Sequence, residues 1–299
     1  MTADRLRVGV LGAASIADRA LIPAMLASRN ATPVAIASRE PARAEAMAAR
    51  HGIPTVHRTY EALLSDPDVD AVYVALANHA HRPWTIAALE AGKHVLCEKP
   101  LGLNATDVQA MAAAASQHQR TLMEAFMYRF HPRMIALHDA ARDVRYLHAA
   151  FSFTLRKDDD YRWRVELGGG ALLDVGCYTL DVARWFLGEP ASVHAVAHEV
   201  GVDMSVATVL SFGTGAEATT WASFEAPEHQ VMELVCADSV RRVEQPFTAW
   251  RDPHDPYQLM VEAFAASVLS DSEPPRSLDD SVGTARLMDR VRLAAGLTR

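Results

Sequence analysis

The fold is decided at residues 7–17, RVGVLGAASIA, where an apolar strand runs into a tight turn and then into a helix. Within the dinucleotide fingerprint G-x-G-x-x-G, this chain keeps only the first glycine, Gly12. Gly12 permits the tight turn, Ala14 lets the backbone approach a pyrophosphate, and Ala17 lets the helix pack closely on the strand. A glycine turn in any α/β protein would look similar, so the surrounding pattern has to decide. The candidate cofactor residues of this turn are Gly12, Ala14, Ser15 and Ile16.

The first 123 residues alternate short apolar runs with helical patterns. This alternation predicts a βαβ series and a parallel sheet. Asn104 can cap a helix, and Gly52 and Gly92 stand where helices should end. We therefore expect residues 1–123 to form a Rossmann domain with a doubly wound parallel sheet. Its strands are predicted near 6–11, 33–37, 71–76, 94–97 and 121–123, and its helices near 15–28, 41–51, 80–91 and 104–118.

The pattern changes after residue 144 to longer runs with partial alternation. The tripeptide Gly213-Thr214-Gly215 between two such runs is typical of a hairpin. Residues 124–299 are therefore expected to form an α+β domain with an open, largely antiparallel sheet. Its strands are predicted at 146–155, 192–200, 205–212, 217–224 and 231–237, and its helices at 171–187 and near 257–270 and 279–296.

Composition narrows the function classes. The chain has 299 residues, 50% of them hydrophobic, which is enough to bury two cores. The net charge is −8 and no run of basic residues occurs, so a nucleic-acid footprint is not expected. The three cysteines have no metal or disulfide spacing, and no apolar run is long enough to span a bilayer. We expect a cytoplasmic protein that acts on small molecules and makes no contact with membranes.

The end of the second strand indicates which dinucleotide is bound. Many NAD enzymes place a carboxylate there for the ribose hydroxyls, whereas this chain has Ser38 and Arg39. A hydroxyl can donate to a 2′-phosphate and a guanidinium can pair with it, with Arg43 one helical turn away as support. NADP(H) is therefore favoured over NAD(H). The alternative is that Arg39 is an ordinary surface residue that opens a helix.

The candidate catalytic cation stands at the end of residues 92–100, GKHVLCEKP. Ligands of open parallel sheets bind outside the carboxyl ends of the strands, which is where Lys99 is expected. Its ammonium would donate to a substrate oxygen and stabilise alkoxide character as hydride leaves the carbon. A structural salt bridge between Glu98 and Lys99 would give the same tripeptide with Pro100.

The helix at 171–187 follows three glycines and carries a polar stripe. Asp174, Tyr178 and Asp181 are spaced i, i+4 and i+7, so they share one face of a mostly apolar helix. The stripe is either the solvent face of the helix or the wall of a substrate site. In the second case Tyr178 is the acid/base, Asp174 binds or orients hydroxyls, and Asp181 adds to the same wall.

Several ordered segments resemble the glucose-fructose oxidoreductase and inositol dehydrogenase superfamily (Gfo/Idh/MocA). The likeness covers nearly the whole length. The matching segments are the turn at Gly12, Asn78 followed by His81, residues 91–95 AGKHV, residues 98–100 EKP, residues 124–132 EAFMYRFHP, and the helix that carries residues 168–181.

The resemblance implies an NAD(P)-dependent oxidoreductase acting on CH-OH groups of sugars or related alcohols, and dimers or tetramers formed through the open sheet. It makes Lys99 the catalytic lysine and Tyr178 its partner. It also places Asn78, His81 and Glu98 at the cofactor and Arg129 at the substrate. Many inositol-type members have histidine where this chain has Tyr178, so the chain looks more like the NADP-dependent aldose (xylose) and dihydrodiol dehydrogenase branch.

Three other functions compete with an aldose dehydrogenase. A related branch reduces keto groups on nucleotide-linked deoxysugars, and the loop YRWR at 161–164 could serve it. There Trp163 would supply an aromatic wall, and Arg162 and Arg164 would suit a diphosphate. A non-catalytic NADP-binding sensor is disfavoured because Lys99 and Tyr178 are both present. A metal hydrolase is suggested by His79 and His81, but the pair lacks a carboxylate or a third histidine at ligand spacing, so no metal site is expected.

Overall fold

The computed structural model describes residues 5–156, 160–248 and 253–297. By packing, these residues divide into two compact units. Unit 1 takes in the described residues of Met1–Leu101, Thr106–His131 and Ala249–Ser281, and unit 2 those of Gly102–Ala105, Pro132–Thr248 and Val282–Arg299. The predicted division into 1–123 and 124–299 follows chain order. Packing adds a late segment of the chain to unit 1.

Unit 1 is built on a parallel sheet, as predicted. Its strands pair in the order β3-β2-β1-β4-β5-β6, so the chain turns one way after β1 and returns on the other side with β4. This reversal between β1 and β4 is the switch point at which doubly wound sheets bind their ligands. The strands are β1 (Leu6–Leu11), β2 (Ala31–Ala37), β3 (Thr55–His57), β4 (Ala71–Val74), β5 (His94–Cys97) and β6 (Leu122–Glu124).

Helices separate these strands, and two of them end at or just before the glycines that the sequence predicted. Gly52 ends α2 with φ 69°, and Gly92 follows α4 with φ 77°. The first helix changes to π geometry just before Pro23, a residue that has no N–H for the helical ladder. The helical elements are η1 (Ala17–Leu21), α1 (Ile22–Ala27), α2 (Pro41–His51), α3 (Tyr60–Leu64), η2 (Asn78–Ala80), α4 (His81–Glu90), α5 (Ala105–His118), η3 (Met127–Phe130) and α8 (Pro256–Leu269). Of these, α8 packs against α1 and η3.

Unit 2 contains a second sheet, with strand order β12-β11-β7-β10-β9-β8. Only β7 and β10 pair in parallel, so the sheet is largely antiparallel as expected. The predicted hairpin joins β9 to β10, where the N–H of Gly215 donates to the carbonyl of Phe212. The strands are β7 (Val144–Ser152), β8 (Pro190–Val200), β9 (Val202–Phe212), β10 (Glu217–Ser223), β11 (His229–Cys236) and β12 (Val240–Glu244).

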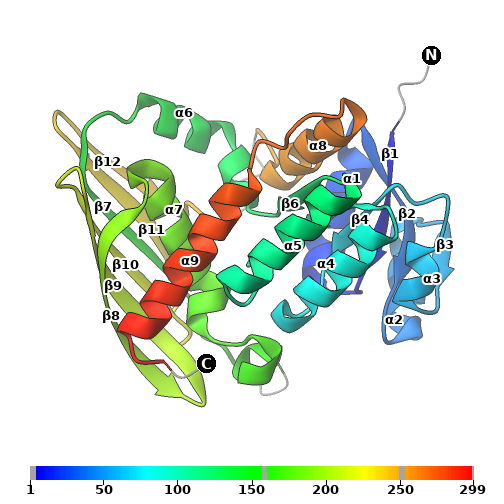
Figure 1. Ribbon diagram of the computed structural model, residues 1–299, viewed down its shortest axis with the longest axis horizontal. Helices are drawn as coiled ribbons and strands as arrows, with labels where there is room; N and C mark the ends of the chain where they lie inside the picture. Colours follow the sequence, from blue (N-terminus) through cyan, green and yellow to red (C-terminus); the bar gives the residue numbers. More distant parts are fainter. Residues whose placement is uncertain (1–4, 157–159, 249–252, 298–299) are drawn as a thin grey trace. The chain divides into compact units, whose positions relative to one another are not determined.

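One face of this second sheet is covered and the other is open. The long helix α7 lies against β7 and β10 (Figure 1), and alternate residues of β9 are buried beneath the helical layer. The helical elements are α6 (Pro132–Ala140), η4 (Tyr161–Trp163), η5 (Val165–Leu167), η6 (Leu172–Gly176), α7 (Cys177–Leu187) and α9 (Leu278–Ala294), whose first turn belongs to unit 1.

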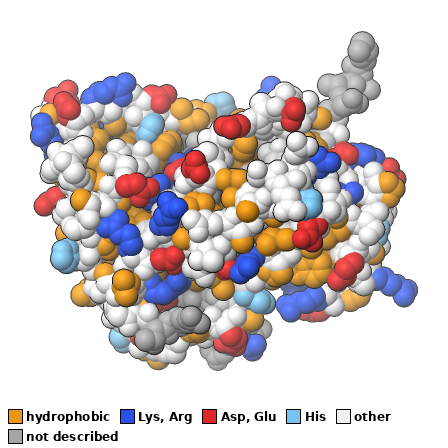
Figure 2. Space-filling view, viewed as in Figure 1, with side chains coloured by type: hydrophobic (Ala, Val, Ile, Leu, Met, Phe, Trp, Pro, Cys, Tyr) orange, Lys and Arg blue, Asp and Glu red, His pale blue; other side chains and the backbone are white. Residues whose placement is uncertain are grey.

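On the face drawn in Figure 2, Lys and Arg side chains are interspersed with Asp and Glu. No helix among the described residues has both the length and the apolar character needed to cross a membrane.

Candidate active site

The loops that follow the parallel strands lie along one edge of the unit 1 sheet. Backbone hydrogen bonds between neighbouring strands continue into these loops. Gly12 donates to the carbonyl of Ala37 at 2.9 Å, and Ala75 donates to that of Leu11 at 2.9 Å. Glu98 donates to Val74 at 3.1 Å, and Ala125 donates to Cys97 at 2.8 Å. The loops after β1, β4, β5 and β6 are therefore fixed in register at the switch-point edge. The candidate cofactor residues and Lys99 lie on these loops, on the loop after β2, or in the first turn of the helices that follow, as Arg43 does in α2 and His81 in α4.

Only glycine fits the turn after β1. Gly12 has φ +104°, and a Cβ placed on it would lie 2.3 Å from the carbonyl oxygen of Ala75. The turn therefore passes within contact distance of the β4 loop, with no side chain between them. Ala14, Ser15 and Ile16 follow at the start of the helical run, and Ser15 is exposed.

The end of β2 presents a hydroxyl and two guanidinium groups. Ser38 is buried, and its Oγ accepts from the N–H of Glu40 at 3.2 Å, which leaves its own hydrogen for another acceptor. Arg39 is exposed. Arg43 donates to the carbonyl of Ala13 at 2.9 Å, so its guanidinium is attached to the turn after β1. The two arginines thus differ: one supports the turn and the other extends into solvent beside Ser38.

The β4 loop carries Asn78, which is 2% exposed, and His81, which is fully buried. The Nδ1 of His81 lies 2.8 Å from the carbonyl oxygen of Pro100, and its Nε2 lies 3.0 Å from that of Leu76. Burial lowers the pKa of His81 to about 4, so the ring is neutral near neutral pH. A neutral ring has one N–H to offer to these two carbonyls. His81 therefore contacts the two loops themselves rather than open space.

Lys99 follows β5 and is partly buried. The hydroxyl of Tyr73 donates to Oε1 of Glu98 at 2.6 Å, and Oε2 of Glu98 accepts from the backbone N–H of Lys99 at 3.3 Å. The Glu98 carboxylate is thus held from within the sheet and in turn holds the main chain of Lys99. The Lys99–Pro100 peptide bond is cis.

Arg129 also belongs to unit 1. Its Nη1 donates to Oδ2 of Asp280 at 2.6 Å, and its side chain is 10% exposed. A carboxylate from the start of α9 is therefore one partner of this predicted substrate-binding cation.

In unit 2 the polar stripe of the long helix is buried, with Asp174, Tyr178 and Asp181 at 4%, 7% and 0% exposure. The stripe is therefore not the solvent face of the helix, which removes that alternative. Asp174 lies in the π-helical turn η6 that precedes α7, and its Oδ2 accepts from Nε of Arg162 at 2.6 Å. Oδ1 of Asp181 accepts from the hydroxyl of Thr284 at 3.0 Å.

Tyr178 has aromatic neighbours within its own unit. Its ring centroid lies 5.6 Å from that of Phe151 and 5.5 Å from that of Phe247. The Tyr178 ring therefore packs against two aromatic side chains of unit 2.

The loop at 161–164 divides its side chains between core and solvent. Trp163 packs against an apolar cluster that includes Ala171 and Phe224. Arg162 contacts Asp160 at 3.1 Å in addition to Asp174, whereas Arg164 is exposed. Of the two arginines considered for a diphosphate, one is therefore engaged by two carboxylates. Among the described residues no group of His, Cys, Asp or Glu side chains is arranged to hold a metal ion.

Two family models match the chain. The first, described as an oxidoreductase family with an NAD-binding Rossmann fold, matches residues 6–126. The second, described as the GFO/IDH/MocA C-terminal domain, matches residues 141–240. Together they span the parallel sheet of unit 1 and strands β7 to β11 of the unit 2 sheet.

Curated relatives and solved structures agree with these models. The chain is 38% identical to D-xylose 1-dehydrogenase (NADP(+)) 2 of Haloferax volcanii, over 95% of each chain. It is 36% identical to dTDP-3,4-didehydro-2,6-dideoxy-alpha-D-glucose 3-reductase of Streptomyces violaceoruber, over 100% of this chain and 98% of the relative.

Among structures, a 3-ketoreductase from Actinomadura kijaniata in complex with NADP and TDP-benzene is 32% identical over 97% of this chain and 98% of the relative, with a TM-score of 0.88. An aldose-aldose oxidoreductase from Caulobacter crescentus is 26% identical over 99% and 98%, with a TM-score of 0.91.

Proposed function

The chain belongs to the Gfo/Idh/MocA oxidoreductase family, and from that premise we propose that it is an NADP(H)-dependent sugar oxidoreductase of the aldose dehydrogenase type. The observation that carries this proposal is the edge of the unit 1 sheet. There the Gly12 turn, the Ser38–Arg39 pair and Lys99 all follow the carboxyl ends of parallel strands. The alternative of a non-catalytic sensor is disfavoured, because Lys99 and Tyr178 are both retained.

The residues of this edge fit NADP(H). The Gly12 turn lies against the β4 loop with no Cβ between them, and the helical run begins beside the turn with its free N–H groups, which suits a pyrophosphate. Ser38 keeps a hydrogen to donate and Arg39 extends a guanidinium, both of which suit a 2′-phosphate. The Haloferax relative is an NADP(+) dehydrogenase and the Actinomadura structure is a complex with NADP, which supports the same choice.

When bound, the nicotinamide of NADP⁺ would supply the hydride acceptor in the oxidative direction. Tyr178 takes the hydroxyl proton of the sugar while the C–H electron pair leaves as hydride, so the carbinol carbon becomes a carbonyl. The Lys99 ammonium donates a hydrogen bond to the same oxygen and stabilises its developing negative charge. In reduction, Tyr178 returns the proton to the oxygen. Asp174 and Asp181 would bind or orient hydroxyl groups of the substrate. Each also accepts a hydrogen bond from a neighbour, Asp174 from Arg162 and Asp181 from Thr284.

A second candidate is an NADPH-dependent reductase of a nucleotide-linked keto sugar. The relatives from Streptomyces and Actinomadura favour it. The ion pairs of Arg162 argue for the free aldose instead, because they leave exposed Arg164 as the cation of the 161–164 loop that is available to a diphosphate.

The deciding experiment follows NADPH absorbance in both directions. Free aldoses are offered with NADP⁺ and a dTDP-linked keto sugar with NADPH, and each assay is repeated with NAD(H). We expect oxidation of an aldose with NADP⁺. Reduction of the dTDP-linked ketone alone would select the second candidate, and no turnover with any pair would favour the sensor.

We further propose that the open face of the unit 2 sheet joins two copies of the chain into a homodimer or a homotetramer. Val196 of β8, Ala207 of β9 and Trp221 of β10 are aligned across neighbouring strands on the face opposite the buried residues of β9. Val196 is 71% exposed, and Val209 nearby is 46% exposed. Exposed apolar patches of this kind mark association surfaces.

The reducing cytoplasm is the compartment we propose, because Cys97, Cys177 and Cys236 are all free and buried.

A further inference from the structure

The peptide group between Pro100 and Leu101 is held at both of its polar atoms. Its carbonyl oxygen lies 2.8 Å from Nδ1 of His81, and its N–H donates to Oε1 of Glu124 at 2.8 Å. His81 comes from the start of α4 and Glu124 from the end of β6, and both are buried. This peptide begins one residue after Lys99, so α4 and β6 together hold the main chain next to the lysine.

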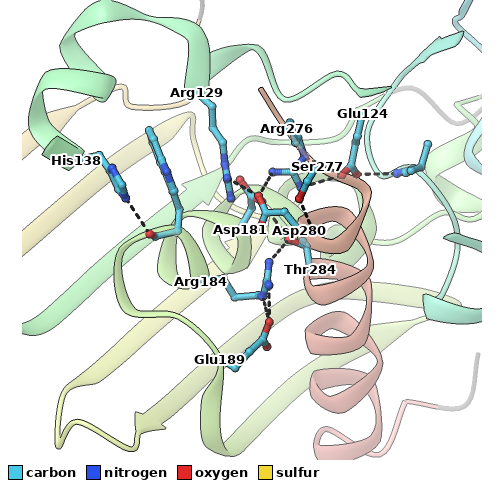
Figure 3. Close-up of polar contacts among 12 residues, drawn as sticks. Glu124, Arg129, His138, Asp181, Arg184, Glu189, Arg276, Ser277, Asp280 and Thr284 are labelled. Atoms are coloured by element: carbon cyan, nitrogen blue, oxygen red, sulfur yellow. Dashed lines mark hydrogen bonds and ion pairs between the residues drawn. The ribbon is translucent and has the colours of Figure 1, made fainter. Parts of the chain in front are cut away.

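Glu124 is itself held by Arg276, from a distant part of the chain. Nε and Nη2 of Arg276 donate to Oε2 of Glu124 at 3.1 and 2.8 Å, and the two side chains are 1% and 3% exposed. The guanidinium lies over the ring of Phe126 at 4.5 Å, and its Nη1 reaches Asp280 at 3.2 Å. Figure 3 shows Arg276 between Glu124 and Asp280.

Stability alone does not explain why the Glu124–Arg276 ion pair is buried. Desolvation of two charges offsets much of their attraction, and an apolar pair of equal volume is often as stable. A carboxylate, unlike an apolar side chain, can accept from a guanidinium with one oxygen and from a backbone N–H with the other. The Glu124 carboxylate does so here, with Oε2 on Arg276 and Oε1 on Leu101.

We propose that Glu124 and Arg276 are positioning residues for Lys99: together with His81 they fix the Pro100–Leu101 peptide and so the point from which the lysine side chain extends. This inference rests on the proposed function, in which the Lys99 ammonium meets the reacting oxygen. Lysine has a flexible four-carbon stem, so its main chain is what the protein can hold still. A shift of about 1 Å at a reacting group costs about 10²-fold in rate.

The test substitutes Glu124→Gln. The amide has one acceptor oxygen, so it cannot serve both Leu101 and Arg276, and its NH₂ would face a donor. Glu262→Gln is the matched control, because Glu262 is 6% exposed and accepts from Nε of Arg29 at 2.9 Å in the same unit. Both variants are expected to lose melting temperature.

The readouts separate positioning from stability. We expect Glu124→Gln to lower kcat, measured per folded enzyme below the onset of melting, by about 10- to 100-fold. NADPH affinity should stay within about twofold, since the positions that carry the cofactor proposal are untouched. Hydrogen exchange at the Leu101 amide should become faster. The control should keep both its kcat and its Leu101 protection.

If Glu124→Gln does not fold, the variants Arg276→Lys and Arg276→Met test the positioning role instead. Lysine keeps the charge and a donor for Glu124, so the kcat of Arg276→Lys should lie between those of Arg276→Met and the unsubstituted protein.

Equal kcat in these three proteins, or unchanged hydrogen exchange at the Leu101 amide in Glu124→Gln, would overturn the positioning role. Parallel losses in kcat and NADPH affinity would do so as well, because the pair would then support the whole sheet edge. If Lys99→Ala retains full turnover, the proposed function fails, whereas the exchange measurement still reports on the peptide contact.

Discussion

Replacing Arg39 by alanine should change which dinucleotide is preferred rather than whether one is bound. The side chain is exposed, so the ion pair proposed between it and a 2′-phosphate would form in contact with water. A hydrogen bond to a charged group contributes about 1.5–3 kcal/mol, and exposed ion pairs contribute about 0–1 kcal/mol. An intermediate value of about 1–2 kcal/mol corresponds to a loss of about 5- to 30-fold in NADPH affinity. NADH has no 2′-phosphate, so its affinity should not change.

The assay is a fluorescence titration of NADPH and of NADH, with unsubstituted protein and Arg39→Ala side by side. Two further variants distinguish loss of 2′-phosphate binding from a general loss of coenzyme binding. Arg43→Ala removes the donor to the Ala13 carbonyl and with it a support of the Gly12 turn, so it should weaken both coenzymes alike. Arg120→Ala, at the opposite edge of the same sheet beside Gly92, should weaken neither. Equal losses of NADPH and NADH affinity in Arg39→Ala would refute the 2′-phosphate role.

The same reasoning predicts that the preference for NADPH over NADH depends on pH. A phosphate monoester takes its second negative charge as pH rises through about 6. The preference for NADPH over NADH should therefore grow between about pH 5 and pH 7 in the unsubstituted protein, and grow less in Arg39→Ala. A preference that does not vary with pH would mean that the dianion is not what Arg39 recognises.

Four further outcomes are expected. Tyr178→Phe removes only a hydroxyl and should lower kcat by about 10²- to 10⁴-fold with NADPH affinity retained, as steady-state kinetics and titration would show. Gly12→Ala places a Cβ 2.3 Å from the Ala75 carbonyl oxygen at φ +104°, so calorimetry should find a lower melting temperature and titration a loss of coenzyme binding. His81 has a pKa of about 4 in the folded protein against 6.5 as its ordinary value, so the unfolded chain takes up the proton first as pH falls. Its contribution of up to about 3 kcal/mol is present above about pH 6.5 and lost toward about pH 4, and urea denaturation should show a flatter pH slope in His81→Gln. Trp221→Glu puts a charge on the open sheet face and should reduce the mass measured by light scattering if that face joins subunits.

The elements that could be predicted from sequence are those whose burial leaves a pattern. Strands β1, β4 and β5 are buried on both faces and appear as nearly continuous apolar runs. The elements that were missed are short or exposed. β3 has three residues, all partly buried, and β12 is the exposed edge run VRRVE. α3 has five residues, and α6 buries only Met134. None of these elements has a hydrophobic periodicity long enough to identify it as a helix or a strand from the sequence.

Sequence reasoning placed candidate residues at strand ends but could not supply their partners. Asp181 has the residue type and spacing of a hydroxyl-binding group, and it accepts from Thr284, 103 positions away. Arg129 likewise donates to Asp280, 151 positions away. No local pattern links such residues, because tertiary packing alone brings them together. Arg276 was missed altogether for the same reason: a single arginine between Pro275 and Ser277 gives no sign that it faces a buried carboxylate.

The Glu124–Arg276 pair also bears on where the dinucleotide-binding unit ends. A fragment that stops at residue 131 would contain all the strands of the parallel sheet and the whole loop that carries Lys99. It would nevertheless leave Glu124 without its guanidinium, and a buried carboxylate that has lost its cation either takes up a proton or draws in water. Both responses weaken the contact that holds the Leu101 amide. The same fragment would uncover α1 and η3, against which α8 packs. All strands of the parallel sheet lie in the first half of the chain, whereas on our proposal the order of the Lys99 loop depends on Arg276, 152 positions after Glu124.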